Sequence, residues 1–282
     1  MLDLKGINGH ESIYSKAWLN SKEGFEIPPC KQTNVSYKDV IESDEGLLKL
    51  LSSLHTNGFC FVPGCPPTNH GTRMLAERIS FIKTTHYGTV WELEANSLHR
   101  DSAYTTKSLP LHTDTPYYTE PIGLQLFHMV SHEGGHGGAS LYADGWRAAR
   151  LLKQRDASLF KVLCEEGISY KHHDKDNLYY EPLKEFPIIT CLANDTFQIR
   201  HNASDWLRLP KTTVFMKALL EWHKALLDCQ FKVQLKAGEP IIIDNWRILH
   251  GREEFSGKRK IIGAYIGHDD YRAKLAQLCM NK

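Results

Sequence analysis

The spacing of apolar residues predicts helices in the first third of the chain and again in its middle. The expected helical regions are 38–56, a helix that starts near Thr68 or Asn69, a pair of helices over 145–166, and 211–227. We expect Asp44 to cap the leucine-rich first helix. The positions expected to face the core are Leu47, Leu48, Leu50, Leu51 and Leu54, then Met74, Leu75, Ile79 and Ile82, and finally Val214, Ala218, Trp222 and Ala225 or Leu226.

Short apolar runs without helical spacing predict strands in the rest of the chain. The expected strands are 58–62, 122–130, 139–144, 239–251 and 258–267, with shorter β-like pieces through residue 199. Helices followed by many short strands favour one mainly-β domain with helical cover, built on a β-sandwich or jelly-roll core. We expect this single domain over 35–282, preceded by an irregular arm over 1–34.

Composition narrows the class of protein. Lys and Arg total 34 and Asp and Glu total 33, so a net charge of +1 disfavours binding to nucleic acid. No apolar run is long enough to span a membrane. The first residues lack the pattern of a secretory signal and carry early acids that are unusual in a mitochondrial transit peptide, so we expect the cytoplasm. Seven scattered cysteines without CxxC spacing predict reduced thiols and no structural zinc.

One His-x-Asp pair is a candidate metal site. The chain contains four such pairs where about two are expected by chance, so the motif alone is weak. His112 and Asp114 stand out because residues i and i+2 of an extended strand point to the same side. His250 ends an apolar strand and can supply a third ligand. Two His and one carboxylate on one face of a metal form the triad of non-haem Fe(II) oxygenases.

Arg259 is a candidate site for an anion. On an extended strand over 258–266 it shares a face with Ile261, Gly263 and Tyr265. A lone inward arginine between apolar neighbours needs a negative partner, and a carboxylate fits its planar fork. Fe(II) with one Asp and two neutral His is +1 and Arg259 adds +1, which balances the −2 of a dicarboxylate such as 2-oxoglutarate. A structural salt bridge is the alternative for Arg259.

Two long blocks of sequence carry a family resemblance. LHTDTPYYTEPIGLQLFHMVSHEGGHGGASLYADG (111–145) and DNWRILHGREEFSGKRKIIGAY (244–265) resemble the Fe(II)/2-oxoglutarate dioxygenases of carnitine biosynthesis, over roughly residues 36–280. The resemblance implies a double-stranded β-helix (jelly-roll) fold, O2 as a substrate and ascorbate as an activator. It also implies iron ligation by His112, Asp114 and His250, and 2-oxoglutarate binding by Arg259.

The same resemblance implies an aromatic cage for a trimethylammonium group. The residues that match it are Tyr87, Trp91, Tyr104 and Tyr265. A trimethylammonium group has no N–H to donate, so aromatic faces suit its methyl surface and add a cation–π attraction of about 0.5–2 kcal/mol each. The alternative is that these are ordinary core aromatics, since the chain has 11 Phe, 12 Tyr and 6 Trp.

The members of this family act on trimethyllysine, which is hydroxylated at C3 in the first step of carnitine biosynthesis, or on γ-butyrobetaine in the last. Trimethyllysine carries an α-ammonium and an α-carboxylate at its far end, whereas γ-butyrobetaine carries only a carboxylate there. Asp101 suits an ammonium and would repel a lone carboxylate. Arg200 and Asn202 match the segment that could hold the α-carboxylate. We therefore expect trimethyllysine as the substrate, with γ-butyrobetaine as the alternative.

The chain also departs from the family pattern. Family members commonly have an N-terminal zinc domain, but Cys30 and His10 are the possible ligands among the first 35 residues, so we expect that domain to be absent or vestigial. A homodimer is therefore an open expectation. Two alternatives also stay open: a catalytically silent jelly-roll protein that binds methylated ammonium groups, and a related dioxygenase that acts on another small acid.

Overall fold

The computed structural model describes residues 2–5, 11–14, 33–94, 105–174 and 178–280. A five-stranded sheet is the larger of its two main sheets and has the strand order β3-β15-β6-β17-β4. All its printed pairings are antiparallel. Its strands are β3 (Phe59–Phe61), β15 (Ile241–Asp244), β6 (Leu124–Glu133), β17 (Lys258–Ile266) and β4 (Val90–Glu94).

A second, four-stranded sheet packs against the inner face of the first. It has the order β14-β7-β16-β5, with β14 (Gln230–Val233), β7 (Ser140–Asp144), β16 (Ile248–Arg252) and β5 (Leu109–His112). Phe127 and Ile243 of the larger sheet share one apolar cluster with Tyr142 and Ile248 of the smaller sheet. Two antiparallel sheets face to face are the expected jelly-roll core.

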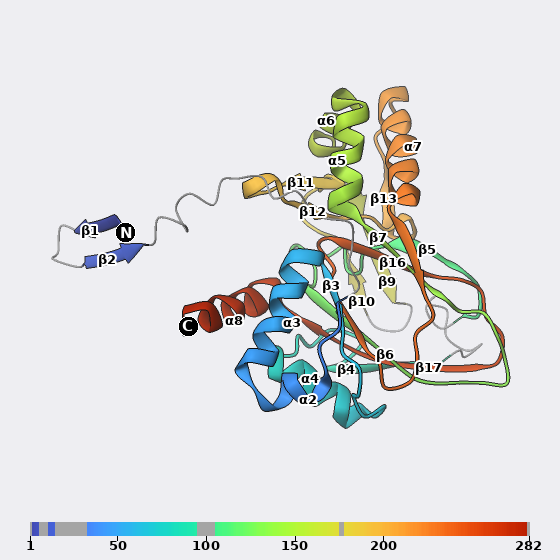
Figure 1. The fold of residues 1–282 in the computed structure, drawn as a ribbon. Helices are drawn as coiled ribbons and strands as arrows, with labels where there is room; N and C mark the ends of the chain where they lie inside the picture. The colour runs from blue at the N-terminus through green and yellow to red at the C-terminus, as the bar shows by residue number, and fades with distance from the viewer. Residues whose placement is uncertain (1, 6–10, 15–32, 95–104, 175–177, 281–282) are drawn as a thin grey trace.

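Helices cover the outer face of the larger sheet (Figure 1). They are α2 (Tyr37–Glu42), α3 (Asp44–Asn57), α4 (Asn69–Ile79) and α8 (His268–Met280). Leu50 of α3 and Leu75 of α4 share a buried cluster with Leu126 and Ile242 of the sheet. The helix expected over 38–56 is divided at Ser43, whose hydroxyl accepts a hydrogen bond from the Gly46 amide. Ser43, rather than Asp44, is therefore the cap.

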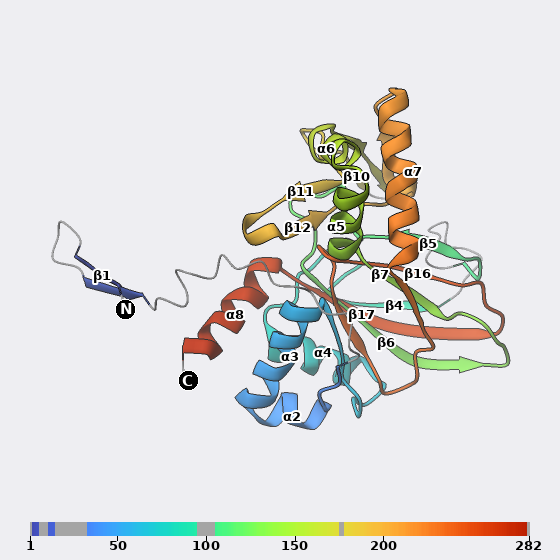
Figure 2. The same ribbon diagram turned by 45° about the horizontal axis from the view of Figure 1, so that its top comes forward.

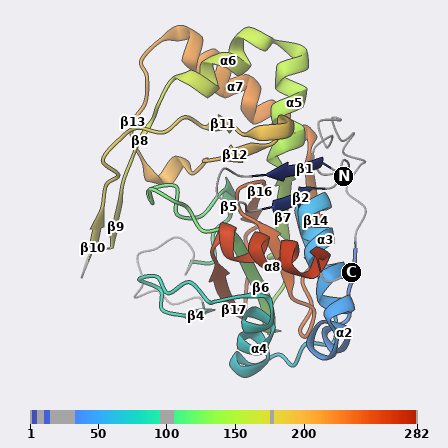
Figure 3. The same ribbon diagram turned by 90° about the vertical axis from the view of Figure 1, so that its left-hand side faces the viewer.

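A second group of helices gathers at the opposite end of the molecule, as Figures 2 and 3 show. It contains α5 (Gly145–Arg155), α6 (Ala157–Glu165) and α7 (Thr213–Asp228). Short strands and 3-10 turns accompany it: β8 (Ser169–Tyr170), β9 (His172–Asp174), β10 (Leu178–Tyr180), β11 (Ile189–Cys191), η2 (Ala193–Asp195), β12 (Phe197–Ile199), η3 (Ala203–Asp205) and β13 (Trp206–Arg208). None of the described helices is long and apolar enough to cross a membrane.

Four details differ from the sequence expectations. Residues 239–251 form two strands in opposite sheets, because a turn over 245–247 separates β15 from β16. Met74 and Val214 are 37% and 52% exposed, and Phe215 takes the expected place of Val214 in the core. Within the expected irregular arm, residues 2–5 and 11–14 pair as the antiparallel strands β1 (Leu2–Lys5) and β2 (Glu11–Tyr14).

Candidate active site

The three predicted metal ligands converge on one point of the smaller sheet. His112 and His250 are cross-strand partners on β5 and β16, and Asp114 follows the end of β5. Asp114 Oδ1 lies 3.4 Å from His112 Nε2 and 3.5 Å from His250 Nε2. One ligand atom from each residue lies within 4.8 Å of the others. The sequence prediction that these three side chains can share one cation is therefore consistent with the geometry.

Hydrogen bonds orient two of the three ligands, His112 and Asp114, and leave one atom of each free for a metal. The Nδ1 of His112 lies 2.8 Å from the Pro110 carbonyl, so it is the protonated nitrogen and Nε2 keeps its lone pair. Gln125 Nε2 and the Tyr265 hydroxyl both donate to Asp114 Oδ2, at 2.7 and 2.9 Å. This arrangement leaves Asp114 Oδ1 facing the two imidazoles. Such supporting bonds orient ligands in metal sites.

The protonation states also suit a metal. Burial lowers the pKa of His250 to about 3, so this imidazole is neutral. Burial alone would raise the pKa of Asp114, but His250, His112 and the hydrogen bonds together hold it well below its usual range. A carboxylate with neutral imidazole is the donor set that Fe(II) accepts in facial-triad sites. The residues present therefore fit the metal that the resemblance implies.

Arg259 is buried on β17 without an ionic partner among the described residues. It is 6% exposed, and its Nε atom is buried with no hydrogen-bond acceptor. Burial and the neighbouring Arg252 lower its pKa to about 10, and the ring of Phe255 lies 5.5 Å from the guanidinium carbon. The salt bridge considered as the alternative is not formed within the described residues. A buried cation of this kind needs an anion from outside the described residues.

Two of the four expected cage residues have neighbouring rings in the apolar cluster between the two sheets. The rings of Trp91 and Tyr265 are 5.5 Å apart and both residues are at most 4% exposed. Gly263, which pairs with Trp91 across the strands, makes this possible because a Cβ there would lie 2.1 Å from the indole ring. Tyr87 packs against the same cluster from a tight turn. Tyr104 and Asp101 lie in 95–104, outside the described residues.

Arg200 and Asn202, the predicted partners of the substrate carboxylate, follow β12 and make hydrogen bonds within the chain. Arg200 is 2% exposed, and its two Nη atoms donate to backbone carbonyls of Pro116, Tyr118 and Thr119. Asn202 caps the η3 turn and donates to Asp205. Both side chains are therefore engaged within the chain. Arg200 is better described as the support of the 116–119 segment that follows the metal ligands.

Sequence reasoning missed a second layer of aromatic side chains beside the site. The ring of Tyr117 stacks on that of His172 at 4.5 Å, and the rings of Tyr118 and Tyr180 are 5.3 Å apart. An open cavity of about 370 Å³ is lined by Tyr117, Tyr118, Thr119, Glu120, Tyr180, Glu181, Pro182 and Leu183. The paired tyrosines directly after the HTDTP motif were the available signal. Aromatic rings and two carboxylates line this cavity, so its chemistry suits a small cation.

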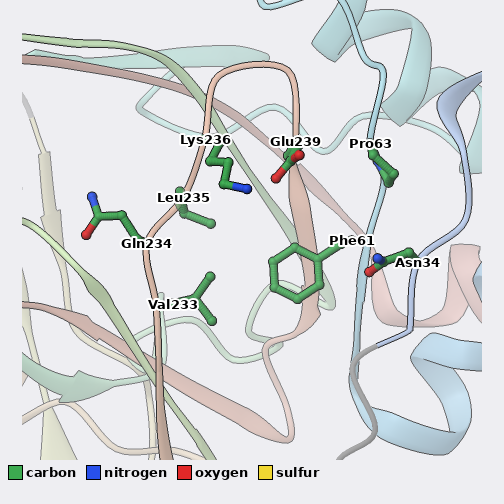
Figure 4. Close-up of a pocket in the computed structure, with 8 residues that line it drawn as sticks. All are labelled: Asn34, Phe61, Pro63, Val233, Gln234, Leu235, Lys236 and Glu239. Atoms are coloured by element: carbon green, nitrogen blue, oxygen red, sulfur yellow. The ribbon is translucent and has the colours of Figure 1, made fainter.

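A smaller cavity lies elsewhere in the fold. Figure 4 shows it between Asn34, the region of β3, and the segment that joins β14 to β15. It measures about 140 Å³ and is lined by Asn34, Phe61, Pro63, Val233, Gln234, Leu235, Lys236 and Glu239. None of the predicted site residues lines it, so it is not the candidate active site.

Comparisons with known proteins agree with this fold and site. The profile of the family described as "Taurine catabolism dioxygenase TauD, TfdA family" matches residues 23–265. The chain belongs to this family of dioxygenases. The structure of an asparagine oxygenase in complex with Fe(II), 3-hydroxyasparagine and succinate has a TM-score of 0.65 and 12% identity, over 84% of this chain and 94% of that chain. This likeness confirms the jelly-roll fold.

The curated relatives that the chain matches point to a narrower type of dioxygenase. A trimethyllysine dioxygenase of Neurospora crassa is 33% identical over 93% of this chain and 64% of its own length. The human enzyme, named as mitochondrial, is 34% identical over 93% of this chain and 68% of its own length. A γ-butyrobetaine dioxygenase of Pseudomonas is more distant, at 25% identity over 96% of this chain and 76% of its length. The chain thus spans about two thirds of the trimethyllysine dioxygenases that it matches.

Proposed function

We propose that this protein is an Fe(II)- and 2-oxoglutarate-dependent dioxygenase that hydroxylates C3 of trimethyllysine. The observation that carries the proposal is the convergence of His112, Asp114 and His250, with one ligand atom of each free and within 4.8 Å of the others. Two imidazoles and one carboxylate leave positions open for a cosubstrate and O2. The 34% identity to the human trimethyllysine dioxygenase, against 25% to a γ-butyrobetaine dioxygenase, favours the substrate.

Each part of the proposed reaction has residues to support it. Iron, when bound, supplies the activation of O2 that an unreactive C–H bond requires, with electrons from 2-oxoglutarate. Arg259 binds the distal carboxylate of 2-oxoglutarate through paired, charge-assisted hydrogen bonds. Trp91 and Tyr265, with Tyr87 and Tyr104, hold the trimethylammonium group by their faces. The chain's contribution is to fix the substrate so that one C–H bond faces the metal.

Three further features belong to the proposal. Ascorbate as an activator and a homodimer follow from the family resemblance. Gel filtration with light scattering tests the dimer. We keep the cytoplasm as the proposed location, with mitochondria as the alternative because the human relative is named as mitochondrial. Fractionation of the source cells decides between the two compartments.

Succinate release tests the proposed function. The protein is loaded with Fe(II) without O2, and then receives 2-oxoglutarate, ascorbate, trimethyllysine and O2. We expect succinate in step with hydroxylated trimethyllysine, loss of both in Asp114→Ala, and retention of both in the exposed control Asp195→Asn. Binding of trimethyllysine without succinate in the iron-loaded protein would overturn the proposal in favour of a silent binding protein.

A further inference from the structure

A second buried carboxylate lies beside the metal ligands without a strong cation to neutralise it. Asp205 is 7% exposed. Its Oδ2 accepts a hydrogen bond from Asn202 Nδ2 at 2.8 Å, and its Oδ1 lies 3.5 Å from His172 Nδ1. No Lys or Arg of the described residues pairs with it. A buried carboxylate in such surroundings is costly unless a cation joins it.

Backbone hydrogen bonds fix the segment of Asp205 against the metal ligands. The Thr113 amide donates to the His201 carbonyl at 2.7 Å, and the His201 amide donates to the Thr113 hydroxyl at 3.0 Å. Thr113 stands between His112 and Asp114 in the chain. The η3 turn that ends at Asp205 follows His201 directly along the chain. The 201–205 segment is therefore held against the part of the chain that carries the two metal ligands.

The aromatic layer links Asp205 to the predicted cage. His172, its ionic partner, stacks on Tyr117 with ring planes at 12°. The ring of His86 lies 5.2 Å from that of His172 and 3.9 Å from that of Tyr87, a predicted cage residue. Tyr117 also lines the open cavity of about 370 Å³. These ring contacts connect Asp205, through His172, to the cavity and to the side of the predicted cage.

We propose that Asp205, positioned by His172 and Asn202, binds the α-ammonium group of the amino-acid substrate. The inference rests on the proposed function and adds the group that selects trimethyllysine. The α-ammonium sits on C2, next to the C3 that must face the metal, so its partner has to lie close to the metal ligands. Asp205 meets this requirement. The other buried carboxylates described, Asp144 and Asp244, are engaged by Arg247 and by Trp246 and Tyr271.

The assignment predicts selectivity. γ-Butyrobetaine has no ammonium group at this position, so it leaves Asp205 unpaired and brings a carboxylate toward it. Both effects disfavour γ-butyrobetaine at this site, because like charges and unpaired charges are costly where water is excluded. Asp101, outside the described residues, stays the competing prediction for the same role.

The test compares two substrates that differ only in the ammonium group. Trimethyllysine and 6-(trimethylammonio)hexanoate are offered separately to the iron-loaded wild-type protein and to Asp205→Asn, Asp101→Asn and the control Asp195→Asn. Dissociation constants are measured without O2 by calorimetry, and kcat and KM are measured with O2. We expect Asp205→Asn to weaken trimethyllysine binding about 30-fold or more, mainly through KM, and to change binding of the hexanoate less than about three-fold.

The outcomes separate the inference from the proposed function. Equal losses on both compounds in Asp205→Asn would mean a structural role and would overturn the inference. The inference would also be overturned if Asp101→Asn lost the selectivity for trimethyllysine while Asp205→Asn kept the selectivity of the wild-type protein. His172→Phe keeps the stacking on Tyr117 and removes the ring nitrogen, and a smaller loss of the same selectivity is expected there. If the wild-type protein turns over neither compound, the proposed function itself fails.

Discussion

At the scale of single residues, the site is defined by buried charged side chains that the described residues do not fully neutralise. Arg259 is a buried cation with no anion beside it in the described part of the chain, and Asp114 keeps one oxygen directed at two imidazoles. Each such group marks where a ligand charge has to sit, because an uncompensated buried charge destabilises the fold. Strand parity made these residues candidates in the sequence, and the family resemblance implied their roles. The sequence could not reveal that Arg200 is occupied, since its partners are backbone carbonyls more than 80 positions away.

Exchange of Arg259 for lysine tests the anion site. Arg259→Lys keeps the charge but loses the planar fork that pairs with a carboxylate. We expect the KM for 2-oxoglutarate to rise about 10-fold or more with the Fe(II) affinity unchanged. Steady-state kinetics with varied 2-oxoglutarate measure this, and Arg147→Lys, at an exposed position, is the control. An unchanged KM for 2-oxoglutarate would show that Arg259 does not bind it.

Removal of the Tyr265 hydroxyl tests the support of the metal ligand. Tyr265→Phe keeps an aromatic face but deletes the 2.9 Å hydrogen bond to Asp114. Because Gln125 still donates to the same oxygen, we expect Fe(II) affinity to fall about 10-fold, the lower end for such supporting bonds. Metal titration without O2 is the measurement. Tyr271→Phe, which deletes a hydroxyl bond to Asp244, is the control and should bind Fe(II) normally.

At the scale of elements, two facing sheets supply different parts of the site. β5 and β16 pair directly and bring the imidazoles together, while β17 carries both Arg259 and Tyr265 on its inward face. The strand over 258–266 was predictable because its alternation is regular. The division of 239–251 was not predictable, because its turn depends on tertiary bonds as well as on local bonds to Asp244. Asn245 accepts a hydrogen bond from the Asp114 amide and donates one to the Ile122 carbonyl.

A methyl group at Gly263 tests the packing of β17 against Trp91. In Gly263→Ala the new Cβ would lie 2.1 Å from the indole ring, so the ring has to move. We expect the KM for trimethyllysine to rise roughly 10-fold, in keeping with the loss of one aromatic face, while Fe(II) affinity is retained. Lys258→Ala, on the same strand with an exposed side chain, is the control. Normal trimethyllysine kinetics in folded Gly263→Ala would argue against Trp91 as a cage residue.

At the scale of the whole molecule, a buried ion pair ties the sheets to the helical layers. Arg247 and Asp144 have side chains 1% exposed and are joined by two hydrogen bonds of 3.1 and 2.7 Å. Arg247 also donates to the Thr56 carbonyl at the end of α3, and Asp144 caps α5. These bonds connect the turn before β16 to both groups of helices. The position of His250 therefore depends on this pair.

Breaking the pair should destabilise the fold more than breaking a surface pair. Arg247→Met leaves Asp144 buried without its partner, so we expect the free energy of unfolding to fall by about 3–5 kcal/mol. Arg150→Met, which breaks the more exposed pair with Asp195, should cost about 1 kcal/mol or less. Urea unfolding followed by tryptophan fluorescence compares the two. Equal losses in both variants would contradict the proposed importance of the buried pair.

One competition assay tests the central claim most directly. Iron-loaded protein receives 2-oxoglutarate, ascorbate and O2 with equal concentrations of trimethyllysine and γ-butyrobetaine, and mass spectrometry follows both compounds. The site described here predicts a gain of one oxygen on trimethyllysine, with γ-butyrobetaine left unchanged. Oxygen gained on γ-butyrobetaine instead would keep the fold and the metal site but contradict the substrate, and no gain on either compound, with iron bound, would contradict the proposed function.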